Sequence, residues 1–515
     1  MMKLLKLYRG LLEMNSNKME IASSYRVILG YVGFCIFLVG AAILSSLLTI
    51  IFYPEEACFA KYFLYPGILS VVVGLALFLP IYKKKKVELY SNHETIIVFL
   101  SWLFAIFICA IPYFLTGEYT FTQSMYESTS GLTTTGLTVM DVESLPKIFL
   151  MYRSITSYVG GIGIILIMTS LFASVFGMRL YNAEGHQNKL IANVIGSSRM
   201  IVVIYTGYMI VGAILFMIFG MQPFDAINHS ISAVANGGFS TKAASIGYYN
   251  SLPIEIITMT LAVLGGTNFL LNLMLIKGNF KAFFKHCETK LMVILWAIFA
   301  PILACILMGT VCVTFGEGFR VALFQIISVM TTSGFSTVDT LASWPAAGIV
   351  VLILFMLVGL GAGSTAGGIK LYRMAIVFKS IYYDIKSKLM PKRAVISKKI
   401  NFYGKDVELT SERVFEAHNF VMVYFVVLFI GTLIVSACGN SVGNSFFEVT
   451  SALSCVGVSI GVSGKGACDV VNWVEIVAML IGRLDIYPVI LTGLVVGKDF
   501  KESIKKSNER KELNV

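Results

Sequence analysis

Ten long apolar runs dominate this sequence and limit the folds that it can adopt. A membrane-spanning helix needs roughly 20 predominantly apolar residues, and each run is long enough to cross a bilayer. Several are longer than an upright helix requires, so they must tilt, break or extend beyond the membrane. The runs lie at about residues 27–53, 62–82, 95–116, 147–176, 200–222, 253–277, 288–315, 346–380, 417–438 and 470–497. They predict an all-α polytopic membrane protein.

The composition supports this fold class and excludes others. The chain has 515 residues, of which 57% are hydrophobic and only 13% are charged, whereas a soluble domain carries about 25% charged residues. The charges are too few for a soluble enzyme, a nucleic-acid-binding protein or a disordered chain. Nine cysteines are scattered singly without a C-x-x-C pair, so neither a zinc site nor a disulfide framework is indicated. We expect no enzyme, no organic cofactor and no nucleic-acid partner.

Basic residues follow every even-numbered run and predict the orientation of the chain. Lys and Arg are concentrated in the cytoplasmic loops of membrane proteins, so we expect both termini to be cytoplasmic. Most of the net charge of 40 − 29 = +11 belongs to these connections. They could face lipid headgroups or form a docking surface, and the connection around 380–415 is the better placed for docking. The basic groups are Lys83–Lys86; Arg179, Lys189 and Arg199; Lys277, Lys281, Lys285 and Lys290; Lys370 to Lys405; and Lys498, Lys501, Lys505 and Lys506.

Four shorter segments between these runs share one pattern. They follow the third, fifth, seventh and ninth runs, are too short to cross the membrane and end in clusters of small residues. The segments read MYESTSGLTTTGLTV, INHSISAVANGGFST, LFQIISVMTTSGFST and FFEVTSALSCVGVSI. Their aligned glycines, 102, 96 and 123 residues apart, are Gly136, Gly238, Gly334 and Gly457. This self-similarity indicates an internal fourfold repeat.

The four copies agree at four further positions around the glycine. Each has a polar residue nine positions earlier, a serine six positions earlier, a bulky apolar residue one position later and a hydroxyl two positions later. We expect the two glutamates among them to hold the loops by hydrogen bonds, and the serines to serve packing. The columns are Glu127, His229, Gln325 and Glu448; Ser130, Ser232, Ser328 and Ser451; Leu137, Phe239, Phe335 and Val458; and Thr138, Ser240, Ser336 and Ser459.

The repeat divides the chain into two leading spans and four units of span, short helix, glycine loop and span. We expect the units to surround one central pore in a pseudo-fourfold arrangement. The predicted divisions are 1–90 for the cytoplasmic N-terminus and leading two-helix hairpin, 91–195, 196–285, 286–400 and 401–500 for pore repeats 1 to 4, and 501–515 for a cytoplasmic tail.

The glycine loops have the chemistry of a cation site. Non-helical backbone is tolerated within a membrane only where it is buried in protein or lines a water-filled path. Inward-pointing carbonyls can replace the hydration shell of a cation, and glycine permits the dihedral angles that this needs. The alternative is that the small residues only allow close helix packing. The candidate ligands are Thr134, Thr135, Gly136, Asn236, Gly237, Gly238, Thr332, Ser333, Gly334, Cys455, Val456 and Gly457.

Two polar features inside the membrane are candidates for a gate. The segment GLGAGSTAGG, residues 359–368, is too rich in glycine for a stable helix, and it forms either a movable loop beneath the glycine loops or a tight packing seam. Arg483 lies near Asp485 in the last run, and a charge at this depth is costly and typically functional. It either faces the pore as a barrier or forms an internal ion pair, whereas Arg153 is expected to pair or to snorkel. The gate candidates are Gly361, Gly363, Ser364, Thr365, Gly367 and Arg483.

At these residues the sequence resembles the TrkH family of bacterial potassium uptake subunits, within the Trk/Ktr/HKT superfamily. The resemblance covers about residues 25–500 and is carried by SGLTTTG, YRSITSYVGGIGIILI, HSISAVANGGFSTKAAS, TTSGFSTVDTLASWP and GAGSTAGGIK. It implies a gated, potassium-selective pore in the inner membrane, with the intramembrane loop at 359–368 and Arg483 as its barrier. It also implies a homodimer and a cytoplasmic nucleotide-binding partner of the TrkA type.

Two copies depart from the stronger threonine pattern of the loops. The second has Asn236-Gly237 and the fourth has Ser454-Cys455-Val456, so we expect only moderate selectivity for potassium over sodium, with rubidium as a further permeant ion. The alternative function is a coupled potassium symporter driven by protons or sodium, because transporters also use repeats and broken helices. A membrane-embedded enzyme would need clustered catalytic side chains, and the sequence offers none.

Overall fold

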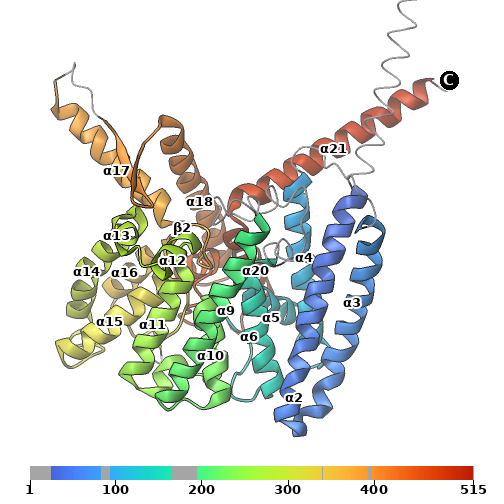
Figure 1. Cartoon of the computed structure of the whole chain (residues 1–515), viewed down its shortest axis with the longest axis horizontal. Coiled ribbons are helices and arrows are strands. Elements are labelled where there is room, and N and C mark those ends of the chain that lie inside the picture. Colours follow the sequence, from blue (N-terminus) through green and yellow to red (C-terminus); the bar gives the residue numbers. More distant parts are fainter. Residues whose placement is uncertain are drawn as a thin grey trace, which may run out of the picture.

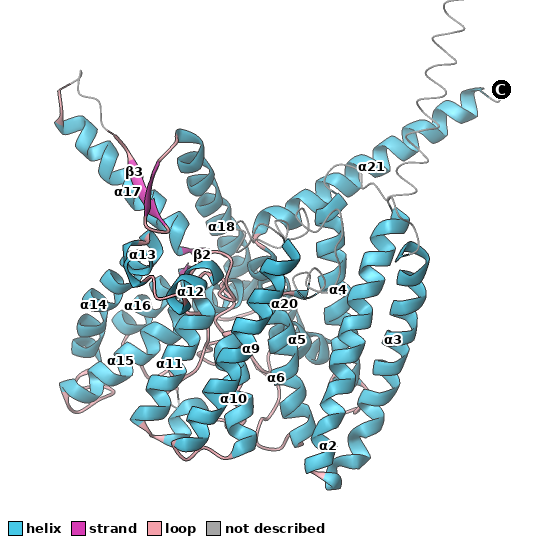
Figure 2. Cartoon of the chain, in the orientation of Figure 1, coloured by secondary structure: helices cyan, strands magenta, loops and turns pink. Residues whose placement is uncertain are grey.

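The computed structural model describes residues 25–82, 93–164, 167, 194–338, 340–391, 397–464 and 466–513. Helices form nearly all of the regular structure in this part of the chain (Figures 1 and 2). Its strands form two short pairs: β1 (Val358–Gly359) runs parallel to β2 (Ile369–Lys370), and β3 (Lys399–Phe402) runs antiparallel to β4 (Lys405–Glu408). The predicted all-α fold class is confirmed.

A leading hairpin of two long helices, blue in Figure 1, stands beside the rest of the chain. The turn of this hairpin is joined to the first repeat, because the Glu56 carboxylate accepts the backbone amides of Lys147 and Ile148, both at 2.7 Å. An acidic group is favourable at such a helix N-terminus. The elements of the hairpin are the helix Tyr25–Phe52, which ends in η1 (Ser46–Leu48) and α2 (Thr49–Phe52), and then η2 (Pro54–Phe59) and α3 (Ala60–Tyr82).

Four units follow, each with a first helix, a short helix, a glycine loop and a second helix, as the repeat predicts. Unit 1 has α4 (His93–Phe114), α5 (Phe121–Leu132) and α6 (Lys147–Ile162). Unit 2 has α9 (Val194–Ile218), α10 (Pro223–Ala235), η3 (Ser245–Tyr249), α11 (Leu252–Gly266), α12 (Phe269–Ile276) and α13 (Phe280–Lys285). Unit 3 has α14 (Cys287–Leu307), α15 (Phe315–Met330), α16 (Ala346–Leu357) and α17 (Leu371–Leu389). Unit 4 has α18 (Ser411–Ala437), α19 (Val442–Leu453), α20 (Asp469–Leu484) and α21 (Ile486–Leu513).

Three of the four short helices, α5, α15 and α19, begin at N-caps with side-chain hydrogen bonds. Thr120 and Thr314 each form a reciprocal capping box, with Gln123 and Glu317 respectively, and Ser441 accepts the amide of Asn444. Such caps satisfy backbone donors that a helix start leaves free. The caps fix where these three helices start, whereas α10 begins with Pro223 in its first turn and has no side-chain cap.

The second helix of every unit breaks soon after the glycine loop. The α6 helix ends at Gly163, with φ +99°, and α11 and α12 meet at an angle of 117°. Residues 358–370 separate α16 from α17, and Asp485, with φ +62°, separates α20 from α21. The sequence left open whether the long apolar runs tilt, break or extend beyond the membrane. In the described chain the runs of these four second helices break, whereas the run at 27–53 forms one continuous helix.

Six helices in the described residues are long and apolar enough to span a membrane, or seven if the bent pair α11 and α12 is one span. The other three of the ten predicted spans coincide with α6, with α16 and α17, and with α20 and α21. The α6 run continues into residues outside the described part of the chain, and the other two are interrupted. The short helices α10 and α15 lie toward one side of the molecule, and α17, β3 and α21 project from the other (Figure 1). We call the second side the basic side, after Lys386, Lys388, Lys398 and Lys399.

Candidate functional site

The four glycine loops, residues 134–136, 236–238, 332–334 and 455–457, are anchored by the same backbone bond. In each, the amide before the glycine donates to the carbonyl of the serine six positions before it. The bonds run from Thr135 to Ser130 at 2.9 Å, Gly237 to Ser232 at 2.8 Å, Ser333 to Ser328 at 2.9 Å and Val456 to Ser451 at 2.9 Å. The predicted alignment of the four copies therefore describes one repeated local structure.

The dihedral angles of the loops alternate in the same way. The residue two before each glycine has a positive φ, 55° in Thr134, 54° in Asn236, 59° in Thr332 and 54° in Cys455. Each glycine then also has a positive φ, between 64° in Gly238 and 92° in Gly136. A left-handed conformation costs a non-glycine residue roughly 1–2 kcal/mol, so surrounding contacts must hold it in place.

The carbonyl oxygens of the loops accept no hydrogen bond from the part of the chain that the structure describes. In the described chain, none of the carbonyls of the twelve candidate ligands accepts a hydrogen bond from another residue. Buried carbonyls are normally paired, so twelve free ones gathered in four equivalent loops form a distinctive cluster. Their oxygen chemistry is that of a site for a dehydrated cation.

The four loops close into a ring around one axis. A Cβ added to Gly136 would collide with the carbonyl of Gly237, and one on Gly238 would collide with that of Ser333. In the same order, Gly334 lies against the carbonyl of Val456, and Gly457 lies against that of Thr135. Each loop thus packs backbone to backbone on the next, and the fourth returns to the first. All four glycines are required by close approach as well as by their positive φ.

Three of the side chains two before each glycine bond to neighbouring parts of the chain. The Asn236 amide donates to the carbonyl of Thr331, and the Cys455 thiol lies 3.4 Å from the carbonyl of Met479. Thr332 accepts the amide of Gly367 through its hydroxyl at 3.0 Å. Asn236 and Cys455, which replace threonine in the second and fourth copies, therefore change the side-chain bonds that support the loops. The backbone geometry of the loop carbonyls is the same in all four copies.

A second fourfold set of bonds holds the outer end of each loop. The polar residue nine before the glycine contacts the hydroxyl two after it, with Glu127 to Thr138 at 2.9 Å and His229 to Ser240 at 2.9 Å. The distances are 2.9 Å from Gln325 to Ser336 and 2.6 Å from Glu448 to Ser459. The expectation that the two glutamates hold the loops by hydrogen bonds is confirmed. The histidine and the glutamine do the same.

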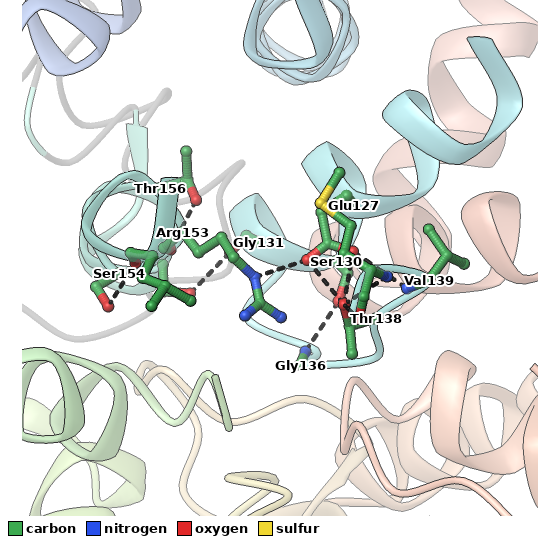
Figure 3. Close-up of polar contacts among 12 residues, drawn as sticks. Glu127, Ser130, Gly131, Gly136, Thr138, Val139, Arg153, Ser154 and Thr156 are labelled. Atoms are coloured by element: carbon green, nitrogen blue, oxygen red, sulfur yellow. Dashed lines mark hydrogen bonds and ion pairs between the residues drawn. The ribbon is translucent and has the colours of Figure 1, made fainter. Parts of the chain in front are cut away.

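In the first unit this contact includes a buried ion pair (Figure 3). The Glu127 carboxylate accepts the Arg153 Nε at 2.7 Å and the Val139 amide at 3.2 Å, and Arg153 is only 2% exposed. The guanidinium of Arg153 also lies 4.0 Å from the ring centre of Phe239, in the second unit. Of the two outcomes expected for Arg153, pairing and snorkelling, the structure shows pairing.

The serine column does more than the packing role that we predicted. The Ser130 hydroxyl accepts the amide of Gly136 at 3.0 Å, and the Ser451 hydroxyl accepts the amide of Val458 at 3.0 Å. In the third unit the Ser328 hydroxyl donates to the carbonyl of Phe335 at 2.6 Å. A purely steric role is therefore wrong for three copies. The recurrence of serine rather than alanine in all four copies is the signal that could have revealed these bonds.

On the side where Thr138, Ser240, Ser336 and Ser459 lie, the ring opens into a cavity of about 270 Å³. The glycine and the following hydroxyl of each unit line this cavity, together with Arg153 and Lys242. The eight symmetric lining residues are Gly136, Gly238, Gly334 and Gly457, with Thr138, Ser240, Ser336 and Ser459. A solvated ion arriving from this side would meet hydroxyls first and then the carbonyl ring.

Residues 358–370 fold into a loop between α16 and α17 that contacts the ring. Its ends are tied by the β1–β2 pairing, and its amides at Gly361 and Gly367 donate to the carbonyl of Gly266 at 2.9 Å and to the Thr332 hydroxyl at 3.0 Å. The Ser364 hydroxyl donates to the carbonyl of Gly361 at 2.7 Å, and Thr365 is fully buried. Gly363, with φ +64°, completes the turn. The segment is an irregular loop touching the glycine loops, so a simple seam between two continuous helices does not describe it.

Two side chains that the sequence did not single out hold this loop at Ala362. The Ala362 amide donates to Glu288 of α14 at 3.0 Å, and the Ala362 carbonyl accepts the side-chain amide of Asn268, at the break between α11 and α12. Both partners lie far from the loop in sequence. Glu288 is an acidic residue at the start of an apolar run, and this position was the sequence signal that could have identified it as a functional candidate.

Arg483 reaches the loop from the fourth unit. Its guanidinium donates to the carbonyl of Thr365 at 2.6 Å, to that of Gly161 at 3.0 Å and to that of Gly160. The Asp485 carboxylate pairs with Arg373 of α17 at 3.2 Å. The arginine thus bridges the loop of the third unit and the helix break of the first, which is a position beneath the ring.

Comparison with known proteins agrees with this architecture. The family model of the TrkH cation transport proteins matches residues 62–502. The chain belongs to the TrkH family. The potassium uptake proteins TrkG and TrkH of Escherichia coli are each 30% identical to it, and each alignment covers 91% of this chain and 98% of theirs. The crystal structure of the potassium transporter TrkH from Vibrio parahaemolyticus is similar, with a TM-score of 0.79 and 28% identity over 91% of this chain and 98% of that one.

Membership of the TrkH family confirms the resemblance inferred from the sequence. It identifies the chain as a membrane transport protein rather than an enzyme. The family match begins within α3 and extends into α21, so it includes all four glycine loops, the loop at 358–370 and Arg483.

Proposed function

We propose that this TrkH-family chain takes up potassium through a central pore, with the twelve loop carbonyls as its selectivity filter. The observation that carries the proposal is the closed ring of four glycine loops, whose carbonyls accept no hydrogen bond from the described residues. Two relatives that align over nearly their full length are named potassium uptake proteins. The carbonyls would replace the hydration shell of the ion, and sodium and rubidium are further candidate permeant ions.

We also propose that residues 358–370 and Arg483 form the gate. The loop lies directly beneath the ring through Gly367, and Arg483 places a positive charge between the loop and the first unit. A fixed cation there opposes the passage of a permeant cation by Coulomb repulsion, which is strong where water is scarce. Opening then requires the loop and the guanidinium to separate.

The wider assembly follows from the same proposal. The basic side would be cytoplasmic in the inner membrane, with both termini there, because basic connections favour that side. The four pore repeats would take the predicted divisions 91–195, 196–285, 286–400 and 401–500. A homodimer with a TrkA-type nucleotide-binding ring on the basic side would supply the regulation.

Two measurements in liposomes, with the regulatory partner present, test the proposed filter. Rubidium flux shows whether the protein conducts, and the reversal potential gives the potassium-to-sodium permeability ratio. Gly334→Ser should lower the potassium-to-sodium permeability ratio at least about tenfold, equivalent to about 1.4 kcal/mol of discrimination, because a Cβ would strike the carbonyl of Val456. Gly443→Ser is the matched control, since a Cβ there meets nothing within 4 Å.

Absence of flux with the partner present, or an unchanged permeability ratio in Gly334→Ser, would overturn the proposed filter. The reversal potential separates the alternative mechanism. In a channel it follows the permeant-ion gradients alone, whereas in a coupled symporter it shifts with the proton or sodium gradient by a fixed stoichiometry.

A further inference from the structure

Two buried carboxylates meet at one hydroxyl beside the fourth glycine loop. Glu448 of α19 and Glu475 of α20 are both fully buried. The Ser463 hydroxyl oxygen lies 2.8 Å from Glu448 Oε2 and 2.9 Å from Glu475 Oε1. Both distances are those of hydrogen bonds.

The number of hydrogens available at Ser463 favours a proton on one of the two acids. A serine hydroxyl has one hydrogen and can donate it to only one carboxylate, and an ionised carboxylate is an acceptor only. Two ionised carboxylates therefore cannot both bond to Ser463. The second contact is completed when one carboxyl group donates its own hydrogen to the hydroxyl oxygen.

The surrounding donors decide which acid is protonated. Glu448 Oε1 accepts the amides of Ile460 at 2.9 Å and Val462 at 3.1 Å, and also the Ser459 hydroxyl at 2.6 Å. Donors of this kind stabilise the ionised form. Among the described residues, Glu475 has one further hydrogen bond, which the Tyr126 hydroxyl donates to its Oε2 at 2.5 Å. The proton therefore belongs on Glu475.

No base in the described residues compensates this pair. In the first and second units, the buried acids Glu127 and Glu255 pair with Arg153 and Arg320, at 2.7 Å in each case. Around Glu475, α5 presents Tyr126 and the already paired Glu127, α19 presents Glu448, and residues 431–437 of the adjoining α18 contain no ionisable side chain. The α21 helix joins α20 only beyond Arg483, at the other end. An uncompensated buried charge is costly, which favours a neutral Glu475.

We propose that Glu475 is a proton-binding site, a carboxylic acid that stays protonated at neutral pH and donates to Ser463. It is a positioning residue, because its proton lets Glu448 keep residues 459–463, and with them the outer end of the fourth glycine loop, in place. Loss of the proton at alkaline pH would leave two negatively charged carboxylates competing for the single hydrogen of Ser463. Their repulsion would release residues 459–463 from Glu448. The consequence for ion flux rests on the proposed function, whereas the proton itself does not.

Infrared spectroscopy of the purified full-length chain tests the proton directly. At neutral pH, the spectrum of the wild type minus that of Glu475→Gln should contain the carbonyl band of a protonated carboxyl group. Glu255→Gln is the matched control and should remove ionised carboxylate bands instead, because Glu255 pairs with Arg320. Loss of carboxylate bands in Glu475→Gln would overturn the proposal. If that variant does not fold, Ser463→Ala should shift the frequency of the protonated band, and an unchanged band would overturn it.

Rubidium flux against pH tests the positioning role. The wild-type flux should fall on the alkaline side, and Glu475→Gln, which mimics the neutral acid, should remove this fall while retaining the flux at neutral pH. A Glu475→Gln profile that falls with the wild type would overturn the positioning role. Absence of flux in both proteins would count against the proposed function, while the infrared result would still decide the proton.

Discussion

Single residues carry much of the proposed selectivity and gating through their backbone contacts. The residues two before the glycines differ in chemistry but share a positive φ between 54° and 59°; they are Thr134, Asn236, Thr332 and Cys455. Their side chains are used to support the loop, so an asparagine or a cysteine can replace a threonine without altering the carbonyl ring. The predicted moderate selectivity for potassium over sodium stays a prediction.

Removing the guanidinium of Arg483 should open a leak. Arg483→Ala deletes the positive charge and the three bonds to the carbonyls of Thr365, Gly160 and Gly161. We expect the basal rubidium flux without the partner to rise at least about tenfold, which corresponds to about 1.4 kcal/mol of barrier. Arg483→Lys keeps the charge without the fork of donors and should be intermediate. A lower basal flux in Arg483→Ala at normal expression would contradict the barrier role.

The buried pair of Glu127 and Arg153 should be needed for stability of the first glycine loop. Glu127→Gln leaves the 2%-exposed Arg153 with an uncompensated charge, and breaking a buried pair in this way costs about 3–5 kcal/mol. We expect a clear drop in the thermal unfolding midpoint of the detergent-solubilised protein. The double variant Glu127→Gln with Arg153→Met should recover most of it. A double variant as unstable as the single one would argue against an uncompensated charge as the cause.

At the scale of elements, the β3–β4 hairpin packs on the start of α14 through His286. This histidine precedes α14 and is buried, with its ring centre 4.7 Å from that of Tyr403 and 5.8 Å from that of Phe402. Burial lowers the pKa of His286 from 6.5 to about 4. The hairpin therefore packs against a neutral imidazole at neutral pH.

Acidification should loosen this hairpin. When the hairpin detaches, His286 regains its ordinary pKa of 6.5, whereas in the packed structure its pKa is about 4. Between these two pH values only the detached histidine binds a proton. The free energy that stabilises the packed hairpin therefore decreases as the pH falls. Hydrogen exchange in residues 399–408 should be faster at pH 5 than at pH 7 after correction for intrinsic rates. His286→Phe keeps the ring without the titration and should remove the difference. Equal corrected rates in the wild type would contradict the assignment.

The elements also show what sequence patterns can and cannot predict. The apolar runs and the register of Gly136, Gly238, Gly334 and Gly457 predicted the four units, because both patterns are local. The hydropathy pattern did not locate the breaks at Gly163 and Asp485. Apolar residues continue across both positions, and hydropathy does not report a change of backbone dihedral angle. The hydrogen bonds of Ala362 with Glu288 and Asn268 form only because segments far apart in the sequence come together. No local sequence pattern predicts such an approach.

At the scale of the whole molecule, four imperfect copies make one symmetric ring. Each unit keeps the same anchor from the loop to its short helix and the same contact between the polar residue and the hydroxyl, while the residues behind them have diverged. The units also differ in what each one adds to this common frame. The third supplies the loop at 358–370, the fourth supplies Arg483 and Glu475, and the first supplies Arg153, which pairs with Glu127.

The central claim is that the carbonyls of the four glycine loops bind the permeant ion. An experimental structure of the protein in rubidium, with the ion located by anomalous scattering, tests it most directly. We expect rubidium on the axis of the ring, coordinated by carbonyls from all four loops, and weaker binding there in Gly334→Ser. Rubidium found only at sites away from the ring, with the four loops intact, would contradict it.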